Sequence, residues 1–260
     1  MKKAPDHVII TGGSSGIGLA LARLYLDQGA KVSLIARSSQ RLEAARQALG
    51  GLAAEKLGLY AADVTDFAAL SEAIHAAEAA SGPCDLLITS AGVVQPARLV
   101  DADMADIRRQ IDTNLIGTIH AAKILWADMA MRGGTMLFIS SGAAFIGLYG
   151  YAPYCASKTA LVALAESLRM EARDTKLKLA LCFPPDTDTP QLAEELKHRA
   201  PEAERVMGTV RPWAAEAVAR HMDRALQKGR LDIHFGPTLF LLARFGSLVR
   251  PLLYWWYGRP

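Results

Sequence analysis

The sequence predicts a single α/β domain built on a doubly wound parallel sheet with helices on both faces. Short apolar runs alternate along the chain with longer helical stretches, which is the order that right-handed β-α-β crossovers require. The first apolar run ends in a cluster of glycines, as strands often do before a tight turn. No repeat, low-complexity tract or Gly/Ser/Pro-rich linker interrupts the alternation, so we expect one folding unit.

Six segments have the length and apolar character of buried strands, and helical segments rich in Ala and Leu separate them. The expected strands span residues 7–11, 31–36, 56–63, 84–90, 134–140 and 178–183. The expected helices span about residues 17–28, 67–80 and 156–174, and one more helix follows the second strand and ends at Leu49. A long helical region is expected over about 103–131.

Composition and charge exclude several classes of protein. A net charge of +3 at pH 7, without a basic run, is too mild to indicate a nucleic-acid partner. Cys84, Cys155 and Cys182 are widely separated and the six histidines are scattered, so we expect neither a disulfide framework nor a metal. The N-terminus lacks the long apolar core of a signal peptide. We therefore expect a cytoplasmic protein.

The turn after the first strand reads TGGSSGIG, residues 11–18. Glycines at 12, 16 and 18 would let the backbone approach a pyrophosphate, and the next helix offers free N–H groups there. The spacing G-x-x-x-G-x-G differs from the G-x-G-x-x-G dinucleotide fingerprint. A glycine-rich turn alone is often only a tight turn, but one between a strand and a helix favours a nucleotide site in a Rossmann-type fold.

The second strand ends in Ala36-Arg37-Ser38, where the sequence distinguishes NAD from NADP. NAD-preferring sites place a carboxylate here, whereas an arginine suits the 2′-phosphate of NADP. Residues 31–41 contain no Asp or Glu. We therefore expect NADP(H), with Arg37 as the main phosphate ligand and Arg41 as a weaker one. The alternative for Arg37 is an ordinary solvated charge.

Tyr154 and Lys158 stand four residues apart in YCASK, so they share one face of a helix. A free tyrosine, with a pKa of about 10, is a poor acid–base group at neutral pH, but a nearby ammonium lowers that pKa. Tyr-x-x-x-Lys often arises by chance. The serines that precede the pair, Ser140 and Ser141, make a catalytic role of Tyr154 and Lys158 more specific.

Together with Asn114 in NLIGT, these motifs resemble those of the short-chain dehydrogenase/reductase family. The resemblance covers about residues 6–236 and implies an NADP-dependent oxidoreductase acting on a ketone or alcohol. It also implies a homodimer or homotetramer, formed through the helices around 103–131 and 156–174.

The resemblance implies a role for each catalytic candidate. Tyr154 would protonate the carbonyl oxygen in reduction, and Ser141, rather than Ser140, would hold that oxygen. Lys158 would bind the nicotinamide ribose and lower the pKa of Tyr154. Asn114 would position a water in the proton relay.

One departure from the family follows the fourth strand, where Asn-Asn-Ala-Gly is replaced by Thr89-Ser90-Ala91-Gly92. The change puts local support of the sheet in doubt, but not the close approach of a cofactor. Asp63, at the end of the third strand, would meet the adenine, or would cap the helix expected near Asp66. The cofactor-binding candidates are Gly12, Ser14, Ser15, Gly16, Ile17, Gly18, Arg37, Asp63, Val64, Ala91, Gly92, Tyr154, Lys158, Pro184, Thr187 and Thr189.

The sixth strand runs into the rigid loop FPPDTDTP, residues 183–190. In the family this strand ends in Pro-Gly and a threonine that closes over the nicotinamide. Here Pro184-Pro185 replaces Pro-Gly, and Thr187 and Thr189 are the expected hydrogen-bonding groups. The run resembles that of one subgroup, the 3-ketodihydrosphingosine reductases.

That subgroup implies a long-chain 3-keto amino alcohol as substrate, reduced at its ketone. The usual glycine after the run is Gln191 here. Asp186 and Asp188 would either bind the substrate's amine or fix the turn. Two alternatives remain: a reductase of 3-oxoacyl thioesters, steroids or another lipophilic ketone, and a non-catalytic NADP(H)-binding sensor or scaffold.

Beyond the FPPDTDTP loop, we expect the chain to divide into a substrate lid and a C-terminal tail. We expect residues 1–236 to form the reductase domain, with residues 189–210 as a substrate lid. Residues 237–260 are apolar and aromatic, with Arg244 and Arg250, and are too interrupted for a spanning helix. The tail would either lie at the inner face of a membrane, with Trp255, Trp256 and Tyr257 at headgroup level, or cover the pocket or a subunit interface.

Overall fold

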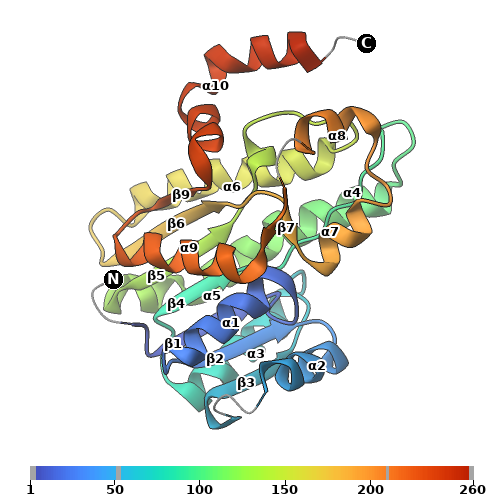
Figure 1. Ribbon diagram of the computed structural model, residues 1–260. Coiled ribbons are helices and arrows are strands. Elements are labelled where there is room, and N and C mark those ends of the chain that lie inside the picture. The colour runs from blue at the N-terminus through green and yellow to red at the C-terminus, as the bar shows by residue number, and fades with distance from the viewer. Residues whose placement is uncertain (1–3, 51–53, 209–210, 258–260) are drawn as a thin grey trace.

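The computed structural model describes residues 4–50, 54–208 and 211–257, and its centre is one parallel sheet (Figure 1). Seven strands run in the order β3-β2-β1-β4-β5-β6-β9, which confirms the doubly wound fold. The strands are β1 His7–Thr11, β2 Lys31–Ala36, β3 Leu57–Ala61, β4 Leu86–Thr89, β5 Gly134–Ile139, β6 Leu177–Phe183 and β9 Asp232–His234.

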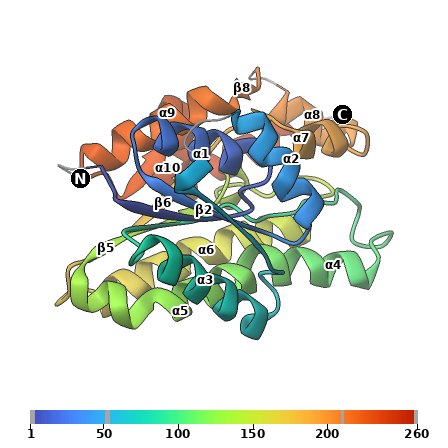
Figure 2. The same ribbon diagram turned by 90° about the horizontal axis from the view of Figure 1, so that it is seen from below.

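Helices cover both faces of the sheet, as Figure 2 shows. α1, α2 and α9 lie on one face, and α3, α5 and α6 on the other. Their bounds are α1 Gly16–Asp27, α2 Ser39–Leu49, α3 Phe67–Ser81, α4 Met104–Ile111, α5 Gly117–Arg132, α6 Ala152–Glu171 and α9 Ala215–Gln227; single turns lie at η1 Ala54–Lys56, η2 Asp112–Ile116 and η3 Gly142–Ala144.

Two apolar cores, one on each face, follow from the period-two geometry of the strands. In β1, Val8 and Ile10 join the core beneath α1 and α9, whereas Ile9 joins the core beneath α3 and α5. All three side chains are fully buried. Strands buried on both faces appear in sequence as continuous apolar runs, which is why the sequence predicted them closely.

The long helical region expected over 103–131 is confirmed, because α4, the π-helical turn η2 and α5 follow one another without a gap from Met104 to Arg132. A π turn adds one residue to a turn and shifts the faces of the helix beyond it. The helix expected over 156–174 begins earlier, at Ala152, because Pro153 is accommodated in the first turn, where its missing N–H has no helical partner.

The crevice of a doubly wound sheet lies where the chain reverses its direction of winding. Here β1 has β2 on one side and β4 on the other, so the carboxyl ends of β1 and β4 flank this position. Thr11 pairs with Thr89 at that edge. The candidate site is built on the loops that leave these strands.

Beyond β6 the chain adds elements above this edge. β7 Thr187–Asp188 and β8 Trp213–Ala214 pair as a two-stranded ribbon, and the chain between them forms α7 Pro190–Glu195 and α8 Pro201–Met207. The last helix, α10 Gly236–Tyr257, is bent at Phe245 and extends away from the sheet (Figure 1). None of the helices in the described ranges combines the length and the apolar character needed to span a membrane.

Candidate active site

A cavity of about 640 Å³ lies at the carboxyl edge of the sheet, within the usual size range of cofactor and ligand sites. Nearly all of the candidate residues from the sequence line it; Gly18 and Asn114 do not. The lining candidates are Gly12, Ser14, Ser15, Gly16, Ile17, Arg37, Asp63, Val64, Ala91, Gly92, Ser141, Tyr154, Lys158, Pro184, Thr187 and Thr189.

The turn between β1 and α1 has room only for glycine at three positions. Gly12 and Gly16 have φ of 70° and 54°, in the left-handed region that favours glycine. A Cβ at Gly12 would lie 2.5 Å from the backbone nitrogen of Ala91, and one at Gly18 would lie 2.5 Å from the carbonyl oxygen of Gly12. The backbone therefore forms a shallow cradle before the N-terminus of α1, which fits the phosphates of a dinucleotide.

Arg37 and Arg41 line the end of the cavity beside β2. Ser38 caps α2 by accepting a hydrogen bond from the backbone N–H of Arg41, which fixes the backbone between the two arginines. Across the described ranges neither guanidinium belongs to an ion pair. Both remain available to an anionic ligand.

Asp63 lines the same part of the cavity, and the capping alternative for it is wrong. Asp66, not Asp63, caps α3 by accepting from the backbone N–H of Ala69 at 3.0 Å. Asp63 Oδ1 instead accepts from the backbone N–H and the hydroxyl of Thr65, both at 2.9 Å. This local turn holds the carboxylate at the mouth of β3.

Tyr154 and Lys158 lie on α6, and Lys158 Nζ is 5.7 Å from the centroid of the Tyr154 ring. Ser141 follows β5, and its side chain is hydrogen-bonded to Tyr154. Ser141 Oγ also accepts from the backbone N–H of Ala143 at 3.2 Å. The neighbouring hydroxyl of Ser140 is buried and donates to the Lys158 carbonyl at 2.8 Å, so it braces α6. This geometry favours Ser141 over Ser140 as the group that meets a substrate.

The expected fall in the pKa of Tyr154 is not observed. Burial raises the pKa of the Tyr154 phenol, the carboxylates of Glu195 and Asp186 raise it further, and the hydrogen bond from Ser141 opposes them. Burial also lowers the pKa of Lys158 to about 8. The reason is that the apolar surroundings disfavour the ammonium as well as the phenolate.

Asn114 lies behind the cavity, in the π turn η2. Its Nδ2 donates to the Val93 carbonyl at 2.9 Å and to Ser157 Oγ at 3.0 Å, and its Oδ1 accepts from the Val93 N–H at 2.8 Å. A Cβ at Gly92 would lie 3.4 Å from Asn114 Oδ1 and 3.6 Å from Lys158 Nζ. The two side chains therefore approach each other across Gly92, but the carboxamide is already engaged in positioning the Val93 backbone.

The departure from Asn-Asn-Ala-Gly leaves one polar group without a partner. Thr89 ends β4, and its buried hydroxyl makes no hydrogen bond to any part of the chain that the structure describes. The local sheet support is nevertheless intact, because the Ser90 N–H donates to the Thr11 carbonyl at 3.0 Å.

The loop after β6 lines the cavity, and its two threonines make hydrogen bonds within the loop. Thr187 donates to the Pro185 carbonyl at 2.9 Å, and Thr189 caps α7 by accepting from the Leu192 N–H at 3.2 Å. The Thr189 side chain also packs against Gly16, where an added Cβ would lie 2.9 Å from its Cγ2. Both hydroxyls therefore shape the loop, and their hydrogen bonds to a cofactor remain predictions.

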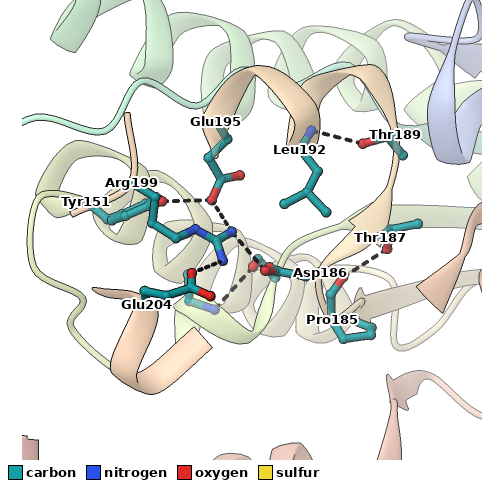
Figure 3. A network of polar contacts seen from close by, with 11 residues as sticks. Tyr151, Pro185, Asp186, Thr187, Thr189, Leu192, Glu195, Arg199 and Glu204 are labelled. Carbon is teal, nitrogen blue, oxygen red and sulfur yellow. Dashed lines mark hydrogen bonds and ion pairs between the residues drawn. The ribbon is translucent and has the colours of Figure 1, made fainter. Parts of the chain in front are cut away.

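A buried charge network that the sequence did not predict lies beneath α7 and α8 (Figure 3). Arg199 Nη2 lies 2.8 Å from Asp186 Oδ2 and 2.7 Å from Glu195 Oε1, and the Tyr151 hydroxyl donates to the same Glu195 oxygen at 2.8 Å. Glu195 and Arg199 stand four residues apart, which is the only signal in the sequence, and such pairs are usually on a solvated helix face.

A cavity that can hold a dinucleotide beside the β1–α1 turn, and that presents a tyrosine proton donor at its far end, suits hydride transfer. The fold and the site therefore define an oxidoreductase that uses a nicotinamide cofactor. Residues 6–200 match the family described as short chain dehydrogenase, and the chain belongs to this family.

Curated relatives agree with the predicted subgroup. The 3-dehydrosphinganine reductase TSC10B of Arabidopsis thaliana is 36% identical over 246 residues, which are 92% of this chain and 73% of the relative. The 3-dehydrosphinganine reductase of Danio rerio is 31% identical, over 95% of this chain and 76% of the relative. The 3-ketodihydrosphingosine reductase of Bos taurus has the same identity and coverage.

A solved structure supports the fold alone. The crystal structure of a variant of actinorhodin polyketide ketoreductase with NADPH superposes with a TM-score of 0.78, over 89% of this chain and 96% of the other, at 22% identity. The sequence-based prediction of a short-chain reductase similar to 3-ketodihydrosphingosine reductases is thus confirmed.

Proposed function

We propose that this chain is an NADPH-dependent reductase that converts the ketone of 3-dehydrosphinganine, a long-chain amino ketone, into the alcohol. The observation that carries the proposal is the similarity to 3-dehydrosphinganine reductases of a plant and of a fish over more than nine-tenths of the chain. The loop after β6, residues 183–190, points to the same subgroup.

The choice of NADPH rests on the arginines beside β2. Arg37 and Arg41 line the cavity, and residues 31–41 contain no carboxylate that would favour a ribose 2′-hydroxyl. The glycine cradle would hold the pyrophosphate, and Asp63 would lie at the adenine. Lys158 would bind the nicotinamide ribose.

In the proposed reaction Tyr154 gives its proton to the carbonyl oxygen, and Ser141 donates a hydrogen bond to that oxygen. Ser141 is suited to this role because its hydroxyl lies beside the Tyr154 phenol, where its hydrogen bond lowers the pKa of that phenol, and because the backbone N–H of Ala143 holds its oxygen in place. When bound, reduced nicotinamide supplies the hydride. Lys158, with a pKa of about 8, is mainly cationic at neutral pH and stabilises the phenolate as it forms.

The proposal is tested by adding purified protein to 3-dehydrosphinganine and NADPH and measuring loss of NADPH with formation of the alcohol. We expect turnover that Tyr154→Phe reduces by about a hundredfold or more, because proton transfer is worth such factors. Thermal unfolding and NADPH binding of the variant serve as controls for folding.

Other outcomes of this assay assign another function. Turnover of 3-oxoacyl thioesters or steroids without turnover of the amino ketone would overturn the substrate. NADPH binding without turnover of any ketone would indicate a non-catalytic sensor or scaffold.

We also propose that α10 meets a membrane surface at its cytoplasmic face, from which a long-chain substrate would be taken up. Residues 236–257 contain no acidic side chain, and Arg244 and Arg250 lie among exposed apolar side chains. Such a composition suits an interfacial helix on anionic lipid. A homodimer or homotetramer, and the lid function of residues 189–210, remain predictions.

A further inference from the structure

The charge network under the lid contains more negative than positive charge. Arg199 has 3% of its side chain exposed and contacts Asp186 and Glu195, whose side chains are 18% and 9% exposed. Its Nη1 lies 3.2 Å from Glu204 Oε2, on a side chain that is 54% exposed. One guanidinium thus faces two enclosed carboxylates and a third at the surface.

The two enclosed carboxylates, and not Arg199, line the cavity that also contains Tyr154. Glu195 uses only Oε1 for Arg199 and Tyr151. Its Oε2 accepts no hydrogen bond from the described residues, and Figure 3 shows this oxygen turned away from Arg199. A carboxylate oxygen with open lone pairs is therefore presented inside the site, on a side chain that is nine-tenths buried.

Enclosed carboxylates that lack a matching cation are unfavourable. Burial raises the pKa of the Asp186 and Glu195 carboxyls, and Arg199 only partly opposes this effect. Both carboxylates also raise the pKa of Tyr154. A cation bound beside the two carboxylates would offset the unfavourable burial of their charge and would oppose the rise in the pKa of Tyr154. The cavity therefore favours a ligand that carries a positive charge close to Tyr154.

We propose that Glu195, together with Asp186, binds the ammonium group of an α-amino ketone while Ser141 and Tyr154 hold its carbonyl oxygen. This inference rests on the proposed function. In 3-dehydrosphinganine the amino group stands on the carbon next to the ketone, so binding of the carbonyl at Tyr154 places the ammonium in its immediate neighbourhood. The two carboxylates are the acidic side chains that line this part of the cavity.

The bound ammonium also assists proton transfer. Tyr154 becomes a phenolate when it gives up its proton, and the carboxylates of Glu195 and Asp186 oppose that negative charge. The substrate's own positive charge offsets them and stabilises the phenolate. The amine therefore contributes to turnover as well as to affinity, and the carboxylates act as specificity-determining groups.

The test compares 3-dehydrosphinganine with the ketone of equal chain length that keeps the 1-hydroxyl and lacks the amine. We expect kcat/KM of the wild type to be about tenfold to a hundredfold higher for the amino ketone, as for a lost charge-assisted hydrogen bond. Glu195→Gln should reduce this ratio at least about tenfold. Asp186→Asn should reduce it in the same direction.

Glu194→Gln is the matched control, because Glu194 is the neighbouring residue in α7, is 62% exposed and pairs with Lys197. The wild-type ratio of the two substrates should persist in this variant. Glu204→Gln is the second control, because it weakens the contact to Arg199 from the solvent side. NADPH affinity and thermal unfolding are measured for every variant.

The outcomes separate this inference from the proposed function. If the wild type reduces neither ketone, the proposed function is wrong. If the wild type reduces both ketones with equal kcat/KM, the proposed recognition of the amine is wrong, whereas the proposed reductase function stands. An unchanged ratio in Glu195→Gln also overturns the inference. If that variant does not fold, the wild-type ratio and Asp186→Asn decide.

Discussion

At the residue scale, the side chains of Arg37 and Arg41 stand at one end of the cavity, and in the described parts of the chain no acid pairs with either. An arginine contact to a phosphate is a charge-assisted hydrogen bond worth about 1.5–3 kcal/mol. Such a contact distinguishes NADPH from NADH, because only NADPH carries the 2′-phosphate.

We therefore predict that Arg37→Met weakens binding of NADPH by about tenfold to a hundredfold and leaves binding of NADH nearly unchanged. Dissociation constants from calorimetry provide the measurement. Arg46→Met is the control, because Arg46 lies on α2, the helix that follows Arg37, and pairs with Glu43. If Arg37→Met weakens binding of NADPH and NADH equally, Arg37 supports the loop and does not bind the 2′-phosphate.

A second residue-scale feature is the buried Thr89 hydroxyl, which has no partner among the described residues. A buried donor without a partner costs about 1–3 kcal/mol, and an apolar side chain of the same shape removes that cost. Thr89→Val is predicted to raise the free energy of unfolding by about 1 kcal/mol.

Chemical denaturation measures this change. Thr118→Val is the matched control and should lower stability by about 1 kcal/mol, since the Thr118 hydroxyl is buried and donates to the Asn114 carbonyl at 3.0 Å. A loss of stability in Thr89→Val would mean that its hydroxyl has a partner in solution.

At the element scale, the six expected strands were predicted closely, because strands buried on both faces are marked by continuous apolar runs. The catalytic candidates were predicted from motifs, and fifteen of the sixteen cofactor candidates line one cavity, with Gly18 packed behind it. The helical region over 103–131 was predicted, but the π-helical turn η2 within it was not. A π turn keeps helical composition, so only its extra residue marks it.

Residues 189–210 show where sequence patterns fail for a different reason. Glu195 and Arg199 have the spacing of a solvated ion pair, yet both are enclosed. Their burial depends on tertiary contacts, because Glu195 meets Tyr151, which precedes it by 44 residues, and Arg199 meets Asp186. A charge pattern cannot reveal those tertiary contacts, and the role of Asp186, left open by the sequence, depended on the same contacts.

At the scale of the whole molecule, α10 concentrates apolar surface on one side of the protein. Eight of the sixteen exposed large apolar side chains in the described chain belong to it: Phe240, Leu241, Phe245, Leu248, Leu252, Tyr254, Trp255 and Trp256. The helix is joined to the site region, because Tyr254 accepts a hydrogen bond from the Gly147 N–H at 3.0 Å. Leu239 packs against Gly142, directly after Ser141. A lipid surface touching α10 would therefore lie close to the substrate end of the cavity.

We predict that the wild type co-sediments with vesicles that contain an anionic phospholipid, and less with neutral vesicles, because Arg244 and Arg250 add electrostatic attraction. The double variant Leu248→Asn, Leu252→Asn should bind about tenfold or more weakly, since each leucine is 72% or 69% exposed in the protein and free to enter lipid. Turnover of a short, water-soluble amino ketone should persist in this variant.

The matched control is Leu99→Asn, Val100→Asn, which removes comparably exposed side chains, 68% and 82%, from the loop before α4. It should leave vesicle binding as in the wild type. If the variant in α10 keeps full vesicle binding but changes the oligomeric mass measured by light scattering, the helix belongs to a subunit interface. That result would replace the membrane with a second copy of the chain, because one apolar face cannot be buried in both at once.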